Sequence, residues 1–274
     1  NTFKCFGCNE GGDIFEFVMK TENLEFRDAL HQLAEEADVP LANTSKHSNT
    51  TAARKISISA NSAAVRFFCQ EFKGEDPAAR YARDYAAERG IDERTQEQFK
   101  IGFARDSWDA LRTYMNKLGH SDENLVQAGL ARRGESGIYD VFRNRLVFPI
   151  LDRRGDVIGF GGRTLGTDPA KYMNTPQTEA FDKGSVLYGL HVAIEPIRAA
   201  RSVVIVEGYM DVIAAHQNSF NNVVAAMGTA ITPGQVRLLR GISKRIVIAL
   251  DADGRIDDDQ HNDTRIAAKR LELN

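Results

Sequence analysis

Apolar and polar residues alternate with a helical period through the first half of the chain. Over residues 24–38, apolar side chains recur at intervals of three and four, which places them on one face of an α-helix. A similar pattern predicts helices over 61–72 and 77–89, the second closed by Gly90, since glycine commonly ends a helix. Shorter helices are expected at 93–98, 107–118 and 122–128.

The period changes from about residue 138 to one typical of strands. Residues 145–151 and 156–163 are rich in apolar and β-branched side chains, and the turn 152–155 between them predicts a hairpin. Beyond residue 198, short apolar segments alternate with helical ones, which implies a parallel sheet covered on both faces. The expected strands are 202–206, 222–226 and 245–250, and the expected helices are 210–217, 233–240 and 264–272.

The ends and the composition of the chain restrict the class of protein. Asn1 is not an initiator Met and residue 274 falls inside a predicted helix, so we expect a piece of a longer protein. No apolar run approaches the roughly 20 residues that cross a bilayer, and the first residues lack the apolar core of a signal peptide. Three cysteines cannot build a disulfide framework, so a reducing, cytoplasmic compartment and no membrane partner are expected.

Charge is unevenly distributed, although the net charge is only −3. Residues 1–40 contain three Lys or Arg and nine Asp or Glu, and residues 246–274 contain four and seven. Residues 132–245 instead contain fifteen basic and ten acidic side chains. Because partners respond to the local field, the negative total does not exclude a nucleic-acid partner, and the basic middle of the chain is compatible with one.

Carboxylates directly follow two of the late strands. The first strand runs into Glu207, with Asp211 four residues later, and the last strand runs into Asp251 and Asp253. The carboxyl ends of parallel strands meet at one edge of a sheet, where open α/β sheets bind ligands. Each motif alone is typical of a turn or a helix N-terminus, but together they favour a cation site, because clustered carboxylates repel one another. Such oxygen ligands suit Mg²⁺ or Mn²⁺, and the site suits phosphoryl or nucleotidyl transfer.

Cys5 and Cys8 are separated by two residues that include a glycine, which is typical of a metal-binding knuckle. A redox pair is the weaker alternative, because such pairs lie between a strand and a helix of a larger sheet. Two thiols cannot complete the tetrahedral site of Zn²⁺, so we expect residues 1–274 alone to bind it poorly. Stoichiometric, chelator-resistant zinc would contradict this.

The order of the carboxylates resembles the Toprim domain that bacterial primases share with topoisomerases and some nucleases. Residues 207–212, Glu-Gly-Tyr-Met-Asp-Val, resemble the version found in bacterial replicative primases, the DnaG family. The segment around Cys5 and Cys8 is similar to the second half of that family's zinc-binding domain. Five further segments resemble the same family in order and spacing, namely 142–150, 157–163, 171–176, 181–184 and 187–190.

This resemblance implies a DNA primase that makes short RNA primers on single-stranded DNA by metal-dependent nucleotidyl transfer. It implies an α+β and α/β fold, in which a mixed α+β polymerase-core subdomain precedes a Toprim parallel sheet flanked by helices, with a partial zinc ribbon at the N-terminus. The implied cofactors are Mg²⁺ or Mn²⁺, and Zn²⁺ in the longer protein. The implied partners are single-stranded DNA, ribonucleoside triphosphates and, through a further C-terminal domain, the replicative helicase. The expected division is 1–40 for the zinc-binding half-domain, 41–60 for a polar linker, 61–197 for the core subdomain and 198–274 for the Toprim domain.

The resemblance also implies roles for individual residues. Asp251, Asp253 and Asp211 would hold the divalent ions, with Glu207 as the general base or as a ligand that positions the base. Guanidinium and ammonium groups suit phosphates, and an aromatic and an amide side chain suit a base or sugar. The phosphate-binding positions map onto Arg143, Arg145, Arg163, Lys171 and Lys183, and the base- or sugar-binding ones onto Tyr172 and Asn174.

Two departures from the family pattern leave alternatives open. About eight residues are inserted between Asp253 and the helix that usually follows it, as an acidic loop or, less expected, as a competitor for the metal. The family's further acidic ligands, the rest of its polymerase core and its helicase-binding domain are expected beyond Asn274, so one expectation is that the whole protein is a working primase while residues 1–274 alone are inactive. The alternatives are therefore another Toprim enzyme, such as a topoisomerase or nuclease, or a catalytically inactive nucleic-acid-binding module. The upstream motifs and the lack of a cleavage-domain tyrosine motif favour the primase.

Overall fold

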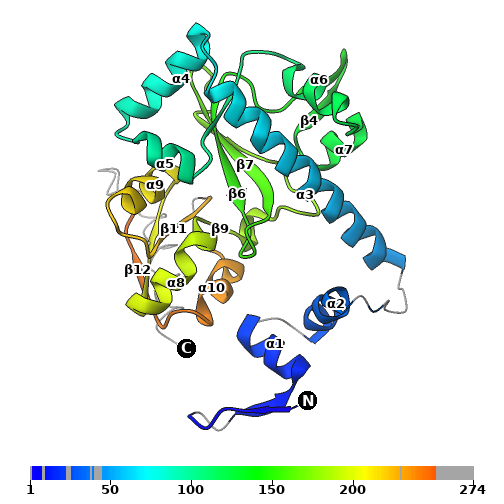
Figure 1. The fold of residues 1–274 in the computed structure, drawn as a ribbon, viewed down its shortest axis with the longest axis vertical. Helices are drawn as coiled ribbons and strands as arrows, with labels where there is room; N and C mark the ends of the chain where they lie inside the picture. The colour runs from blue at the N-terminus through cyan, green and yellow to red at the C-terminus, as the bar shows by residue number, and fades with distance from the viewer. Residues whose placement is uncertain are drawn as a thin grey trace.

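The computed structural model describes residues 2–7, 10–22, 26–37, 39, 45–228 and 230–250 (Figure 1).

The N-terminal segment is a small hairpin followed by two helices. The two strands pair antiparallel, and the rings of Phe3 and Phe17 meet edge to face with their centroids 5.1 Å apart, which packs the first helix onto the hairpin. The elements are β1 (Thr2–Lys4), β2 (Gly11–Asp13), α1 (Ile14–Glu22) and α2 (Phe26–Glu36).

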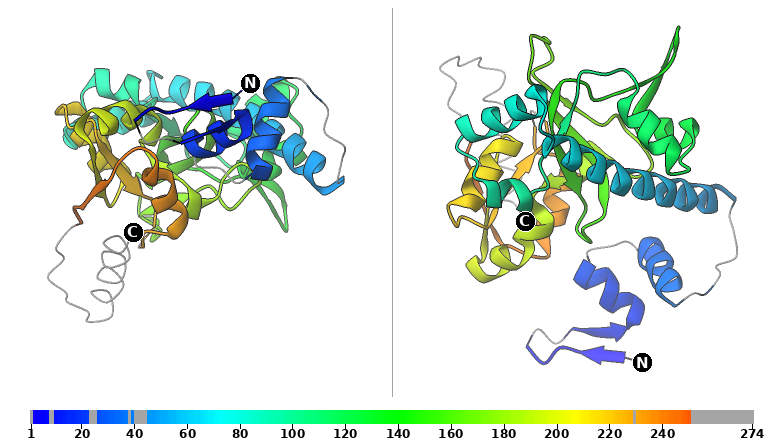
Figure 2. Two further views of the ribbon diagram at one scale, coloured as in Figure 1. Left: turned by 90° about the horizontal axis from the view of Figure 1, so that it is seen from below. Right: turned by 45° about the horizontal axis from the view of Figure 1, so that its top comes forward.

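Helix α3 (Ser45–Phe72) runs along one face of the central antiparallel sheet (Figures 1 and 2). Residues 45–60, which fall in the linker expected at 41–60, form the first half of this helix. The stretch is polar but contains neither glycine nor proline, so nothing in it breaks a helix. The second half buries Ala64, Phe67 and Phe68 under the sheet, and this packing stabilises the whole helix.

The central sheet is antiparallel, with the strand order β3-β6-β7-β8. The predicted hairpin is confirmed as β6 and β7, and the expected turn joins them. Alternate residues of β6 face opposite ways: Phe148 packs towards α4 and the second sheet, while Val147 packs under α3. A separate two-stranded hairpin, β4–β5, was not predicted. The bounds are β3 (Gly102–Ala104), β4 (Ala131–Gly134), β5 (Gly137–Asp140), β6 (Arg145–Leu151), β7 (Val157–Thr164) and β8 (Tyr172–Asn174), with α4 (Pro77–Glu88), α5 (Glu93–Gln98), α6 (Ala110–Lys117) and α7 (Asp122–Gln127).

The second sheet has the order β12-β10-β11-β9. Its first three strands are parallel, as predicted, but β9 is antiparallel and makes the sheet mixed. Helices cover both faces: Val203 and Ile205 of β10 pack with α8 and α10, and Val204 and Val206 pack towards α9. The helix predicted at 264–272 lies outside the described residues. The bounds are η1 (Lys183–Ser185), β9 (Leu187–Tyr188), α8 (Leu190–Ala200), β10 (Ser202–Val206), α9 (Tyr209–Gln217), β11 (Val223–Ala226), α10 (Pro233–Arg240) and β12 (Arg245–Ile248).

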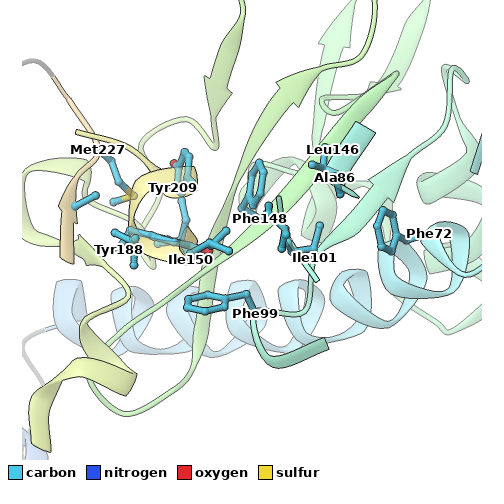
Figure 3. Packing of buried hydrophobic residues seen from close by; sticks show 14 of the residues in the cluster. Phe72, Ala86, Phe99, Ile101, Leu146, Phe148, Ile150, Tyr188, Tyr209 and Met227 are labelled. Carbon is cyan, nitrogen blue, oxygen red and sulfur yellow. The ribbon is translucent and has the colours of Figure 1, made fainter. Parts of the chain in front are cut away.

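A shared cluster of buried side chains joins the two sheets (Figure 3). Phe148 comes from β6 of the antiparallel sheet, Tyr188 from β9 of the mixed sheet and Tyr209 from the start of α9. All three are buried, so the sheets share one hydrophobic core and are fixed relative to each other. None of the described helices combines the length and apolar character that a membrane-spanning helix needs.

Candidate functional site

Two exposed carboxylates lie at the carboxyl end of β10. Glu207 follows the strand directly, and Asp211 stands in the first turn of α9. Asp211 Oδ2 accepts a hydrogen bond of 3.0 Å from the Gly208 backbone amide, so this carboxylate caps the helix and is held beside the strand end. The sequence predicted this pair from the strand–turn–carboxylate pattern alone.

Strand β12 lies beside β10 and runs parallel to it. Ile248 pairs with Ile205, and the Ala249 amide donates to the Ile205 carbonyl at 2.9 Å. Both strands therefore end at the same edge of the sheet, which is where a ligand of an open α/β sheet binds. The predicted ligands Asp251 and Asp253 lie outside the described residues.

The donor set at this edge fits part of a site for a hard divalent ion. Glu207 and Asp211 offer carboxylate oxygens, which Mg²⁺ and Mn²⁺ prefer, and both are exposed at the strand end. Within the part of the chain that the structure describes, no group of three acidic, histidine or cysteine side chains is close enough to hold a metal. A complete site therefore needs donors beyond these two.

Arg163 lies on β7 and is held between two tyrosines. Its guanidinium donates to the hydroxyl groups of Tyr85 and Tyr172, and lies 5.5 and 4.9 Å from the centres of their rings. A guanidinium stacked in this way is fixed in orientation. Tyr172 is 41% exposed on β8, whereas Arg163 is buried beneath it, so of these two predicted residues only the tyrosine is open to solvent.

Arg145 is deeply buried, as Arg163 is, whereas Lys171 and Lys183 are exposed. The Arg145 side chain is 2% exposed and donates to the Asp168 carboxylate and, at 2.9 Å, to the Ala170 carbonyl. These contacts tie β6 to the loop that leads into Lys171, which is exposed. Direct contact of Arg145 with a phosphate would therefore require the loop to move, whereas Lys171 is accessible as placed.

Arg143 forms a platform with two aromatic rings. Its guanidinium lies 4.1 Å from the centre of the Trp108 ring and 5.3 Å from that of Tyr139, and it donates to the Asp140 carbonyl. Trp108 is 64% exposed, which is unusual for this residue type. Sequence reasoning missed Trp108, although a lone tryptophan in the polar stretch 105–109 is a signal that could have identified it.

Asp140 holds this platform in place. Its backbone amide donates to the Trp108 carbonyl at 2.8 Å, and its buried carboxylate accepts hydrogen bonds from the Leu111 and Arg112 amides at the start of α6. Burial raises the pKa of Asp140 from 3.8 to about 6, against the lowering effect of these two amides.

This raised pKa predicts a pH-dependent contribution to stability. The folded protein holds the Asp140 proton to a higher pH than the unfolded chain does, so the stabilisation is complete below about pH 4 and is lost as the pH rises through about 6. We expect Asp140→Asn to remove this decrease in the free energy of unfolding between about pH 4 and pH 6. Urea unfolding between pH 4 and 8 measures it, with Asp106→Asn, at an exposed position, as the control. Parallel pH curves for the wild type and Asp140→Asn would contradict the assignment.

Lys183 lies beside the carboxyl end of β11. A Cβ added at Gly228 would stand 3.3 Å from Lys183 Cε, so the side chain runs against this glycine. The side chain of Gln235 fixes the backbone of the short helix η1, since its amide nitrogen donates to the Lys183 and Val186 carbonyls at 3.2 and 3.0 Å. Strands β10 and β11 are neighbours and run parallel, so their carboxyl ends lie at the same edge of the mixed sheet. Glu207 lies at the end of β10, and the Lys183 side chain lies beside the end of β11.

Cys5 lies in the tight turn of the N-terminal hairpin. Its amide donates to the Glu10 carbonyl at 2.7 Å, and Gly7 lies beside its sulfur, with room for a Cβ at an ordinary contact distance of 3.9 Å. A cysteine in a hairpin turn of this kind fits one half of a metal knuckle. Cys8 lies outside the described residues.

Comparison with known proteins identifies three domains along this chain. Residues 1–49 match the model of the CHC2 zinc finger, 67–194 that of the N-terminal domain of the DNA primase catalytic core, and 201–255 that of the Toprim domain. A solved DnaG primase catalytic domain, bound to single-stranded DNA, is 34% identical, with a TM-score of 0.71 over 79% of this chain and 68% of its own. The chain belongs to the DnaG primase family.

Other members of the DnaG family show how much of such a protein is present. The DNA primase of Clostridium acetobutylicum is 41% identical over 92% of this chain, which spans 42% of that relative. The zinc-binding and RNA polymerase domains of Aquifex aeolicus primase are 31% identical, with a TM-score of 0.69 over 97% of this chain and 63% of that one. The chain thus spans less than half the length of a curated DnaG relative.

Proposed function

We propose that the protein containing this chain is a DNA-directed RNA primase that joins ribonucleotides on a single-stranded DNA template. The observation that carries the proposal is the placement of Glu207 and Asp211 at the edge of a sheet that shares one core with the antiparallel sheet carrying Arg163 and Tyr172. Nucleotidyl transfer needs carboxylates for metal ions and cations for phosphates around one substrate. Membership of the DnaG family supports the same chemistry.

The divalent ions would be held by Glu207 and Asp211 together with Asp251 and Asp253. When bound, Mg²⁺ or Mn²⁺ supplies positive charge to the triphosphate and lowers the pKa of the attacking hydroxyl. Glu207, directly after the strand, would accept the proton of that hydroxyl or orient the group that does. Asp211 is held by the Gly208 amide, so it would keep one oxygen towards the helix terminus.

The phosphates of the nucleotides would contact Arg163, Lys171 and Lys183. Lys171 and Lys183 are exposed and accessible as placed. Arg163 is 6% exposed and is held by two tyrosine hydroxyls, so its direct contact with a phosphate would require these tyrosines to move. Tyr172 would stack on a base or sugar from the same surface. Arg145 would instead support the loop that leads into Lys171, through its contacts with Asp168 and Ala170, and would not contact the phosphates directly.

The template would lie across the Trp108 platform. The exposed indole offers a stacking surface for one base, and Arg143 beside it offers charge to the neighbouring phosphate. An indole stacks on any base and a guanidinium binds any backbone phosphate, so neither group would select a particular DNA sequence. A protein that copies different template sequences needs contacts of this kind.

The N-terminal segment would bind Zn²⁺ in the longer protein, with Cys5 and Cys8 as two of four ligands. The match to the CHC2 zinc finger and the knuckle turn at Cys5 support this. The site of action we propose is the replication fork in the cytoplasm, where a replicative helicase would bind through a further domain.

One assay separates this function from its alternatives. The full-length gene product is incubated with single-stranded DNA, ribonucleoside triphosphates and Mg²⁺ or Mn²⁺, and the products are resolved by length. Short RNA supports the primase. Nicking or relaxation of duplex DNA without RNA would support another Toprim enzyme, and DNA binding without any product would support an inactive binding module.

A further inference from the structure

Tyr209 is the first residue of α9 and stands two residues after Glu207. It is almost fully buried between rings from both sheets: it lies parallel to Phe148 with centroids 5.4 Å apart, and edge to face with Tyr188 at 4.7 Å (Figure 3). Burial of an aromatic ring in this way contributes strongly to packing and fixes its position. The residue that begins the carboxylate-bearing helix is therefore locked between the two sheets.

A glycine on β7 makes room for this ring. A Cβ added at Gly161 would overlap the Cζ, Cε2 and Oη atoms of Tyr209. The tyrosine therefore lies directly against the backbone of the strand that carries Arg163 two residues later. Gly161 also pairs with Asn174 across the β7–β8 ladder, which brings the Asn174 side chain to the end of the tyrosine.

The hydroxyl of Tyr209 completes the contact. It donates to Asn174 Oδ1, and Asn174 Nδ2 donates to the Met227 carbonyl at 3.4 Å, just after β11. Burial raises the pKa of Tyr209, so the hydroxyl stays protonated and keeps its role as donor. Each polar atom of Asn174 thus makes one hydrogen bond, the oxygen with Tyr209 of α9 and the nitrogen with the residue that follows β11, and these two bonds fix the orientation of its side chain.

We propose that Tyr209, Asn174 and Gly161, here named the Tyr209 joint, position the end of β10 that carries Glu207 relative to the antiparallel sheet that carries Arg163 and Tyr172, as nucleotidyl transfer requires. The inference rests on the proposed function and assigns Asn174 a positioning role in place of a ligand role. Glu207 and Asp211 flank the tyrosine on the chain, and Arg163 and Tyr172 flank Gly161 and Asn174 on their strands. A shift of the joint therefore changes the distance between the two halves of the site without touching either half.

The joint predicts that loss of one hydroxyl lowers the rate of chemistry more than it lowers stability or binding. Tyr209→Phe retains the ring and its packing but cannot hold Asn174. We expect kcat for primer synthesis to fall roughly 10–100-fold, because a small misplacement of reacting groups has effects of this size. The KM for ribonucleotides, the Kd for single-stranded DNA and the Tm should stay close to those of the parent.

Tyr188→Phe is the matched control. Tyr188 packs against Tyr209 in the same cluster, but within the described part of the chain its buried hydroxyl has no hydrogen-bond partner. Removing that hydroxyl should leave kcat unchanged. A second variant, Asn174→Ala, should lower kcat as Tyr209→Phe does, and the double variant should be no slower than the slower single variant, because both break the same contact.

The measurements use the full-length gene product. Wild-type kcat in Tyr209→Phe, an equal loss in Tyr188→Phe, or a loss that only follows a lowered Tm would overturn the joint and leave the proposed primase function intact. Multiplicative losses in the double variant would also overturn it. A parent protein that makes no RNA would overturn the proposed function, and the joint would fall with it.

Discussion

Glu207→Gln is expected to reduce RNA primer synthesis on the order of 10²–10⁴-fold while leaving the fold unchanged. The side chain is exposed directly after β10, so its replacement by an isosteric amide disturbs no packing. It removes the charge that would hold a divalent ion or accept a proton from the attacking hydroxyl. Circular dichroism and Tm should match the parent, and the loss should appear in kcat at saturating template.

Glu195→Gln is the matched control for this variant. Glu195 is an exposed glutamate on α8 that forms a surface ion pair with Arg198 at 2.7 Å. Such a pair contributes little to stability, so the control should retain full activity. Retained synthesis in Glu207→Gln, or an equal loss in both variants, would remove Glu207 from the site.

Trp108→Ala is expected to weaken binding of single-stranded DNA about 5- to 150-fold, the range that corresponds to roughly 1–3 kcal/mol for one stacked base. The indole is exposed and supports no core packing, so stability should change little. Arg143→Ala should weaken binding as well, but in addition it should reduce the salt dependence of the affinity by about one counterion, because in the proposed function the arginine, and not the indole, would contact a phosphate. Fluorescence anisotropy at several salt concentrations measures both effects.

Phe220→Ala provides the comparison at equal exposure. Phe220 is 65% exposed, against 64% for Trp108, but it follows α9 at the opposite end of the mixed sheet from Glu207. Its removal should leave the affinity unchanged. A similar loss in both variants would mean that exposed aromatic side chains bind DNA nonspecifically, and the platform would have no special role.

Much of the fold could be predicted because the relevant signals are local. The β6–β7 hairpin follows from two apolar runs around a four-residue turn, and the parallel strands follow from short apolar segments between helices. The start of α3 could not be predicted, since its polar first half is helical by virtue of packing further along the same helix. The two-residue strand β9 is likewise set by its neighbour β11, which carries the pairing.

The candidate site divides in the same way. Glu207 and Asp211 follow from the end of a buried strand, which the sequence displays directly. The burial of Arg145 and the platform at Trp108 depend on loops that return from distant parts of the chain, such as the contact of Arg145 with Asp168. Tyr209 resembles an ordinary core residue in the sequence. Its contact with the backbone at Gly161 and its hydrogen bond to Asn174 join distant parts of the chain, so only the structure shows them.

The most direct test is the sequence of the product. The full-length gene product and its Glu207→Gln variant are given a natural single-stranded DNA with ribonucleoside triphosphates and Mg²⁺ or Mn²⁺, and any RNA formed is sequenced. A template-directed site built around Glu207 predicts short RNAs complementary to the added DNA, absent without template and absent with the variant. RNA that does not match the template, or equal yields from both proteins, would contradict it.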